Sequence, residues 1–289
     1  MQILFNGIIS GLTIGLLAMA FNTVYLPTRV FHFALAGVYA SAPFFAWQLR
    51  EWDLSWPLAV TVSMILGALF SLACEAFNHF RLQRKGSSSG AHFVSSLGLY
   101  IVAVQFVALT WGNETKVLRV GIDGATGFGQ TTFTHAQLIA GSVSLGLLAM
   151  FYCWLRFTNL GLRLRALAEN PIQLALHGYN TRRLRLLAFG IAGLLASVSA
   201  LLVAYDIGFG PHDGLTALLL AIVAVIVGGR DTWLGPVLGA VAVGLLRSEV
   251  VWFLSAKWQD AVTFALLALF LFLRPHGLFG RKIRLEATA

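Results

Sequence analysis

The chain has 289 residues, of which 58% are hydrophobic and only 11% are charged, and its mean hydropathy is +0.79. A soluble globular protein has about half of its residues apolar and about a quarter charged. The composition therefore excludes an ordinary soluble domain and predicts an integral membrane protein, with residues 1–289 forming a single transmembrane domain.

Apolar runs of about 17 to 25 residues are long enough to cross the hydrocarbon core as helices. In chain order the candidate runs are Ile3 to Tyr25, Val30 to Leu49, Trp56 to Phe77, Ala91 to Trp111, His135 to Arg156, Leu184 to Tyr205, Gly214 to Gly228, Trp233 to Phe253 and Trp258 to Leu273. They predict an all-α fold, a polytopic transmembrane helical bundle of about 8–10 spans that includes short or broken helices. The first run lacks a preceding basic segment and is too long for a signal peptide, so we expect it to be retained. Pro27 and Pro43 predict that the second run is broken or re-entrant.

The basic residues are concentrated in alternate loops. They are Arg81, Arg84 and Lys85 in one loop, Arg156, Arg163, Arg165, Arg182, Arg183 and Arg185 in the next, and Arg274, Arg281, Lys282 and Arg284 in the tail. Because Lys and Arg near span ends are retained on the cytoplasmic side, we predict a cytoplasmic C-terminus and, with nine spans, an external N-terminus. This topology accounts for the formal net charge of +8 without a nucleic-acid partner.

The longest basic loop has the signals of a short helix. Asn170 is a good N-cap, Pro171 suits the first helical position, and Gly178 suits the left-handed position after the last turn. Glu169 would lie near the positive end of this helix dipole, and Thr181 is expected to cap the helix of the next span. The sequence therefore predicts a helix of about two turns between Asn170 and Gly178.

Two interpretations of this loop, residues 157–183, remain open on the pattern alone. An interfacial helix can be anchored by its arginines to anionic lipid headgroups. The same helix can instead form a docking surface for a partner protein.

Three segments resemble permease subunits of branched-chain amino-acid ABC importers, the LivH/LivM type. The first is the loop Asn-Leu-Gly-Leu-Arg-Leu-Arg-Ala-Leu-Ala-Glu-Asn-Pro from Asn159 to Pro171, followed by His177 to Asn180. The second is the Gly-Gly and Gly-Pro turn within residues 228–240, and the third is Arg-Pro-His-Gly-Leu-Phe-Gly from Arg274 to Gly280. The first half of the chain resembles the family more weakly. The resemblance implies a permease of the bacterial cytoplasmic (inner) membrane.

The resemblance also implies partners. The residues that match the family's ATPase-docking loop are Arg165, Glu169, Asn170, Pro171 and Gly178. The chain has no phosphate-binding loop, because the Gly86 to Gly90 segment lacks the lysine. We therefore expect no cofactor on this chain and no enzymatic activity. ATP and Mg would be used by two separate P-loop ATPase subunits, joined by a second permease in a heterodimer and by an extracytoplasmic solute-binding protein, within the lipid bilayer.

The sequence leaves the identity of the translocated solute open. Before its second span the family commonly has Asn-Phe-Ala-His-Gly, whereas this chain has His-Phe-Ala-Leu-Ala from His32 to Ala36. The altered polar pair indicates that the solute can differ from leucine, isoleucine or valine, and related importers carry urea, short amides or aromatic acids. The predicted translocation-path residues are His32, Ser95, Ser96, Gly98, Gly228 and Gly229, and the predicted outer hinge is Gly208, Gly210 and Pro211.

The glycine pairs Gly190/Gly193 and Gly235/Gly239 are expected to allow close helix packing rather than to bind a ligand. Glu75 is expected to be solvated or to cap a span end.

Arg247 is expected to extend to the interface from an outer span end. The histidines are scattered in sequence, so no metal site is predicted.

Two other classes of membrane protein remain as alternatives. An ion-coupled secondary transporter or channel usually needs ionisable residues inside the membrane, and the centres of these spans are almost uncharged. An intramembrane enzyme needs converging acids and bases, for which Asp206 and Asp213 are the only modest acidic pair.

Overall fold

The computed structural model describes residues 1–119, 124–128, 131–274 and 277–279. The α-helices are α1 (Gln2–Thr28), α2 (Ala34–Glu51), α3 (Trp56–Ala73), α4 (Phe80–Arg84), α5 (Ser89–Trp111), α6 (His135–Phe157), α7 (Asn159–Glu169), α8 (Pro171–Leu176), α9 (Thr181–Asp206), α10 (Asp213–Gly228), α11 (Gly235–Phe253) and α12 (Gln259–Leu273). A π-helix, η1 (Cys74–His79), joins α3 to α4, and a 3-10 turn, η2 (Ala256–Trp258), precedes α12. The strands β1 (Ala125–Phe128) and β2 (Thr131–Thr134) form an antiparallel hairpin.

Every predicted apolar run contains a helix, so the predicted all-α polytopic bundle is confirmed. Within the described part of the chain, 7 helices are long and apolar enough to cross a membrane, and α10 is apolar but shorter. The helix α2 is not among these, and it ends in the charged pair Arg50 and Glu51. It continues through Pro43, so the prediction of a broken helix there is wrong. The chain is non-helical between Arg29 and His32, just after Pro27.

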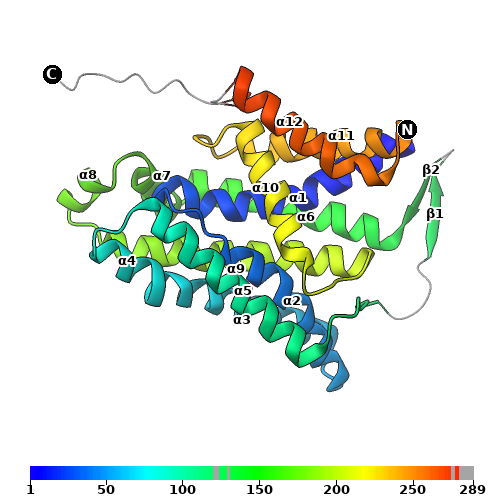
Figure 1. Ribbon diagram of the computed structural model, residues 1–289, viewed down its shortest axis with the longest axis horizontal. Coiled ribbons are helices and arrows are strands. Elements are labelled where there is room, and N and C mark those ends of the chain that lie inside the picture. The colour runs from blue at the N-terminus through cyan, green and yellow to red at the C-terminus, as the bar shows by residue number, and fades with distance from the viewer. Residues whose placement is uncertain (120–123, 129–130, 275–276, 280–289) are drawn as a thin grey trace.

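The elements define two ends of the bundle (Figure 1). At one end lie α4, α7 and α8, and we call it the α8 end. At the other lie the N-terminus and the β1–β2 hairpin, and we call it the hairpin end. The side chain of Gln2 joins these two, because its amide donates to the carbonyl oxygen of Thr132 at 2.8 Å and accepts from the Thr132 N–H at 2.9 Å. The hairpin was not predicted from sequence.

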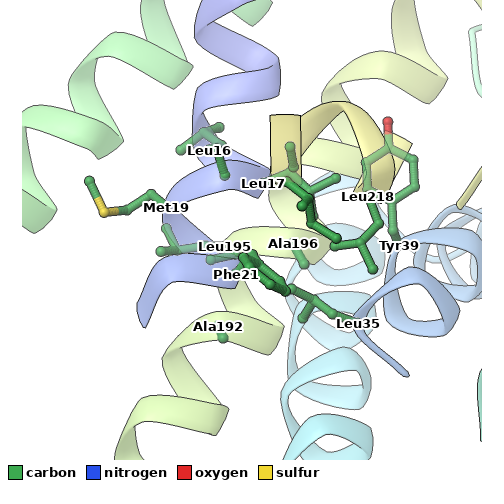
Figure 2. Close-up of a cluster of buried hydrophobic side chains, with 14 of the residues drawn as sticks. Leu16, Leu17, Met19, Phe21, Leu35, Tyr39, Ala192, Leu195, Ala196 and Leu218 are labelled. Atoms are coloured by element: carbon green, nitrogen blue, oxygen red, sulfur yellow. The ribbon is translucent and has the colours of Figure 1, made fainter. Parts of the chain in front are cut away.

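The helix α1 lies at the centre of the bundle and contacts α6, α9, α10 and α11. Its buried residues include Leu16, Leu17 and Phe21, which pack against Leu35 of α2 and Leu218 of α10 (Figure 2). A helix that is apolar on all faces and buried along most of its length is typical of a central span. The first run is therefore part of the structural core.

Small residues let the helices approach closely. A Cβ added at Gly11 of α1 would lie only 2.7 Å from the Cα of Val241 in α11, so the two backbones meet there. At Gly193 of α9 a Cβ would lie 2.7 Å from the carbonyl oxygen of Gly67 in α3. At Gly239 it would lie 2.7 Å from the backbone nitrogen of Gly228. The packing role predicted for Gly193 and Gly239 is confirmed, whereas a Cβ at Gly190 would be in ordinary contact with Leu72 at 3.5 Å.

Candidate functional site

The larger cavity opens at the hairpin end and has a volume of about 530 Å³. Its walls come from α1, α2, α6, α9, α10 and α11. These helices converge because α1 packs against α6, α9, α10 and α11, and α2 packs against α9 and α10. Polar lining side chains include Asn6, Ser10, Thr13, Tyr39, Ser199 and Thr216, and apolar ones include Ile14, Leu17 and Leu220. A cavity of this size with mixed walls suits a small amphipathic solute.

Charged side chains lie on both sides of this cavity. Asp206 and Asp213 come from α9 and α10, and Arg247 comes from α11. The carboxylate of Asp213 accepts a hydrogen bond from the Gly210 N–H at 2.6 Å. The guanidinium of Arg247 donates to Asp260 of α12 at 2.7 Å, and its side chain is only 16% exposed. The bond to Asp260 holds Arg247 against the cavity, and its position relative to the membrane interface stays a prediction.

The predicted outer hinge contributes to the wall of this cavity. Gly208 and Gly210 line it, and Pro211 follows directly. Gly208 has φ +95°, and a Cβ there would lie 2.9 Å from the carbonyl oxygen of Lys116. Lys116 and Phe209 exchange two backbone hydrogen bonds of 2.9 and 2.8 Å, which fix this turn to the loop after α5. The location fits a hinge, while the hinge motion stays a prediction.

The predicted path residues lie elsewhere. None of His32, Ser95, Ser96, Gly98, Gly228 and Gly229 lines the larger cavity as described. Ser96 accepts from the Ala34 N–H at 2.9 Å, and Ser95 donates to Asn78 at 2.6 Å, so both make interhelical hydrogen bonds. Gly98 has no neighbour within 4 Å of an added Cβ. Sequence reasoning missed the cavity residues because α1 gave only isolated small polar residues within an apolar run.

Gly228 and Gly229 end α10 and form a joint with α11 and the C-terminal segment. The N–H groups of Leu278 and Phe279 donate to the carbonyl oxygens of Val227 and Gly228 at 2.8 and 3.1 Å. These bonds satisfy carbonyls that the end of α10 leaves without helical partners. The rest of the closing signature (Pro275, His276 and Gly280) and the basic tail residues Arg281, Lys282 and Arg284 lie outside the described residues.

The predicted short helix is present as α8. The side chain of Asn170 accepts from the N–H groups of Ile172 and Gln173 at 3.1 and 3.0 Å, and Pro171 occupies the first helical position. Gly178 has φ +82°, as predicted for a left-handed stop. The next span is capped by Asn180, which accepts from the Arg183 N–H at 3.1 Å, so the prediction that Thr181 caps it is wrong.

A second helix in this loop, α7, was not predicted. Thr158 caps it by accepting from the Gly161 N–H at 3.1 Å, and Leu164 and Leu167 bury its inner face. The spacing of these leucines was the signal that sequence reasoning missed. Glu169 is its last residue, and Arg165 lies within it, donating weakly to the carbonyl oxygen of Arg156 at 3.5 Å.

The helix α8 packs against the bundle on one face and exposes apolar side chains on the other. Leu174 is buried in a cluster with Leu164 and Leu184. Ile172 and Leu176 point away from the bundle and are 72% and 81% exposed. An apolar pair on a polar loop at the α8 end is a candidate contact for another protein.

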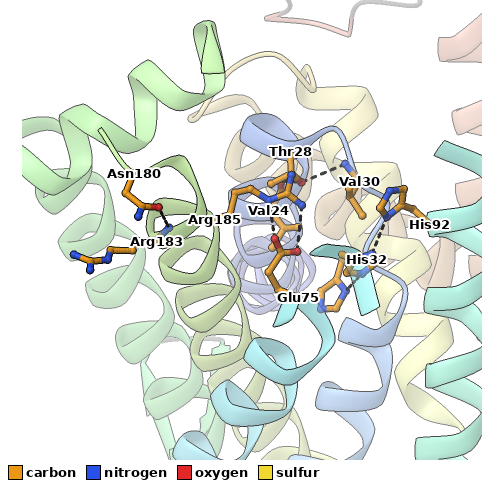
Figure 3. Close-up of polar contacts among 10 residues, drawn as sticks. Val24, Thr28, Val30, His32, Glu75, His92, Asn180, Arg183 and Arg185 are labelled. Atoms are coloured by element: carbon orange, nitrogen blue, oxygen red, sulfur yellow. Dashed lines mark hydrogen bonds and ion pairs between the residues drawn. The ribbon is translucent and has the colours of Figure 1, made fainter. Parts of the chain in front are cut away.

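Buried polar groups lie behind this loop. Glu75 in η1 is 1% exposed and receives two hydrogen bonds from Arg185 of α9, at 2.6 and 3.2 Å (Figure 3). The prediction that Glu75 is solvated or caps a span end is therefore wrong. The partner was not predicted because 110 residues separate the two in sequence.

Three histidines that are distant in sequence, His32, His79 and His92, form a row through contacts between their rings. Figure 3 shows His32 and His92 near Glu75 and Arg185. His32 Nδ1 lies 3.2 Å from His79 Nε2, and His79 Nδ1 lies 3.2 Å from His92 Nδ1. The premise that the histidines are scattered holds for the sequence but not for the structure. Among the described residues no group of three or more His, Cys, Asp or Glu side chains is arranged to hold a metal ion.

Comparison with known proteins places this architecture. Residues 3–271 match the family described as branched-chain amino acid transport system / permease component. The chain is 26% identical to the high-affinity branched-chain amino acid transport system permease LivH of Salmonella typhimurium, over 97% of this chain and 96% of that protein. BraD of Pseudomonas aeruginosa, which carries the same description, is also 26% identical over the same shares of the two chains.

One solved structure is similar in fold. PsaBC from Streptococcus pneumoniae in complex with Fab aligns over 96% of this chain and 94% of that chain, with a TM-score of 0.53 and 13% identity. The chain therefore belongs to the family of permease components of branched-chain amino-acid transport systems, as a multi-pass membrane subunit of an ABC transporter.

Proposed function

We propose that this permease moves a branched-chain amino acid, or a related small polar or amphipathic solute, from the hairpin end to the α8 end. ATP and Mg are used by two separate P-loop ATPase subunits that dock on α7 and α8. A second, similar permease completes a heterodimer, and an extracytoplasmic protein delivers the solute at the cavity mouth. The relatives LivH and BraD, named as branched-chain amino acid permeases, support the solute class.

The observation that carries the docking proposal is the geometry of α8. Its cap at Asn170 and its stop at Gly178 fix a short rigid helix, and its bare side presents Ile172 and Leu176. The inner face rests on α7 and α9 through Leu174, so a push on α8 would be passed to the α9 span. This contact suits alternating access between two discrete packings of the helices.

The α8 end is the cytoplasmic end in this proposal, and we expect the C-terminus on the same side of the membrane. Arg81, Arg84 and Lys85 in and after α4, with Arg163 of α7 and Arg182 of α9, belong to this end. Reaction of single introduced cysteines with an impermeant maleimide in intact cells tests the orientation. Trp52→Cys should react and Ser87→Cys should not, in a background without Cys74 and Cys153; the opposite result would reverse the topology.

Affinity purification in mild detergent, followed by mass spectrometry, tests the partners. The wild-type chain should bring down P-loop ATPases and a second permease, and Leu176→Asp should reduce ATPase recovery by about tenfold, because a carboxylate would be buried in an apolar contact. Leu254→Asp is the matched control, since Leu254 is 61% exposed and directly follows α11, outside α7 and α8. Equal ATPase recovery from both variants would refute the docking surface. Recovery of the chain alone, with uptake that depends on an ion gradient, would favour an ion-coupled secondary transporter.

A further inference from the structure

A second, smaller cavity lies at the α8 end and has a volume of about 130 Å³. It is enclosed by the connection between α1 and α2, by the turn between α4 and α5, and by α9. Its polar lining residues include Arg29, Gln83, Ser87, Ser89, His92 and Arg185. The larger cavity and the α8 docking surface share none of these residues.

Two guanidinium groups line this cavity, and each keeps N–H donors without a protein partner. Arg29 uses Nη1 for its 2.8 Å bond to Asp231. Arg185 uses Nε and Nη2 for Glu75. Within the described residues the other N–H groups of both arginines make no hydrogen bond. Arginine donors of this kind match the oxygens of a phosphate or carboxylate.

The amino end of α5 contributes further donors. Ser88 caps this 23-residue helix by accepting from the Ala91 N–H, and Ser87 and Ser89 flank the cap beside the cavity. Unpaired N–H groups and the positive end of the dipole favour an anion at such a position. The hydroxyl groups of Ser87 and Ser89 and the amide of Gln83 have no hydrogen-bond partner among the described residues. The cavity is therefore rich in donors from three separate elements.

The contacts of the histidine row determine which ring nitrogen of the lining residue His92 carries its proton. A carbonyl oxygen only accepts, so the 2.7 Å contact from Ser71 Oγ to the carbonyl oxygen of Phe189 takes the serine proton. The 3.3 Å contact between Ser71 Oγ and His32 Nε2 then requires an N–H on His32 Nε2. With neutral rings, His32 Nδ1 accepts from His79 Nε2, and His79 Nδ1 accepts from His92 Nδ1.

This order leaves His92 Nε2 with a lone pair. His92 is 6% exposed and lines the cavity, and its Nε2 has no partner among the described residues. A ligand that offers oxygens to the arginines and an O–H to His92 therefore matches the donors and the acceptor that line the cavity. Phosphate and phosphomonoesters carry both groups, whereas sulfate and phosphodiesters carry only acceptor oxygens.

We infer that this cavity binds a phosphomonoester or inorganic phosphate, with Arg29 and Arg185 on the phosphate oxygens and the P–OH donated to His92 Nε2. Free phosphate and the headgroup of phosphatidic acid share this chemistry. Arg81, Arg84 and Lys85 lie in and directly after α4, close in sequence to the lining residues Gln83 and Ser87, and basic residues at such a span end attract anionic headgroups. A bound phosphate would connect the end of α1, the start of α5 and α9, which all contribute residues to this cavity.

Calorimetric titration of the full-length protein in lipid-free detergent at neutral pH tests the free ion. Inorganic phosphate should bind about tenfold more tightly than inorganic sulfate, because only phosphate has an O–H to donate to the His92 lone pair. In a second arm, native mass spectrometry of protein from nanodiscs compares retained phosphatidic acid with retained phosphatidylglycerol. Selective retention of phosphatidic acid assigns the lipid headgroup, and phosphate binding without such retention assigns the free ion. Either result supports the site.

Three variants separate a built site from general attraction to basic residues. Arg29→Gln should weaken phosphate binding by about tenfold through the loss of a charge-assisted bond. Arg84→Gln is the matched control, because Arg84 is exposed on the same turn and does not line the cavity. His92→Gln supplies an N–H donor and should bring sulfate affinity up to that of phosphate. Equal binding of phosphate and sulfate by the wild type, no binding of either probe, or an equal loss in Arg84→Gln would overturn the inference.

Discussion

The buried pair of Glu75 and Arg185 gives the sharpest test of the structure. Its two bonds of 2.6 and 3.2 Å are bidentate, and the side chains are only 1% and 10% exposed. Removing one partner leaves an uncompensated buried charge, so Glu75→Met or Arg185→Met should each lower the free energy of unfolding by about 3–5 kcal/mol. The pair lies between η1 and α9, so its loss should loosen the attachment of the α7–α8 loop to the bundle.

The double variant Glu75→Met with Arg185→Met removes both charges and fills the site with apolar side chains of similar length. Such replacements of buried ion pairs are often neutral or stabilising, so the double variant should lie within about 1–2 kcal/mol of wild type. Unfolding by sodium dodecyl sulfate in mixed micelles, followed by circular dichroism, measures all four proteins as a double-mutant cycle. The reasoning is refuted if either single variant loses less than about 1 kcal/mol, or if the double loses the sum of the two.

The remaining predictions concern the loop and the helix packing. Asn170→Ala removes the two cap bonds to Ile172 and Gln173 and should cost about 0.5–2 kcal/mol locally, seen as faster amide exchange in α8; unchanged exchange would contradict the cap. Gly178→Val places a β-branched residue at φ +82° with no steric contact, at a cost of at least about 1–2 kcal/mol, and should uncouple ATP hydrolysis from transport while membrane insertion is retained. Normal coupling in that variant would count against the docking proposal. Gly11→Ala should destabilise the fold by about 1–3 kcal/mol because its Cβ would lie 2.7 Å from Val241 Cα, whereas Gly98→Ala, with nothing within 4 Å, should be tolerated; similar thermal stability of the two would exclude the close packing of α1 and α11.

The local features of the α8 loop could be predicted because each depends on neighbouring residues. An N-cap such as Asn170 bonds backbone groups two and three residues ahead, and a stop such as Gly178 depends on its own φ angle. The same local logic failed at Thr181, since Asn180 competes for the same cap and has the stronger preference. The helix α7 has neither the apolar length of a span nor a cap-and-stop pair as clear as that of α8, and only the spacing of its leucines marks it.

The polar groups of the interior could not be predicted in the same way. Burial turns Glu75 from an apparent span-end residue into half of an ion pair, and its partner is 110 residues away. His32, His79 and His92 come from three different segments and meet only when α2, η1 and α5 pack together. Arg247 likewise depends on the return of α12, which brings Asp260 to it.

The sequence by itself determined the membrane class, the positions of the spans and the local structure around α8, because hydropathy, caps and left-handed stops are properties of short segments. Only the tertiary structure decided where the two cavities lie and which residues line them. The larger cavity excludes the predicted path residues such as Ser96, whose hydroxyl is used in an interhelical bond, and takes its polar walls from α1 and α9 instead. The reason is physical: a polar side chain in an apolar helix can face a cavity or a neighbouring helix, and the packing of the other helices makes that choice.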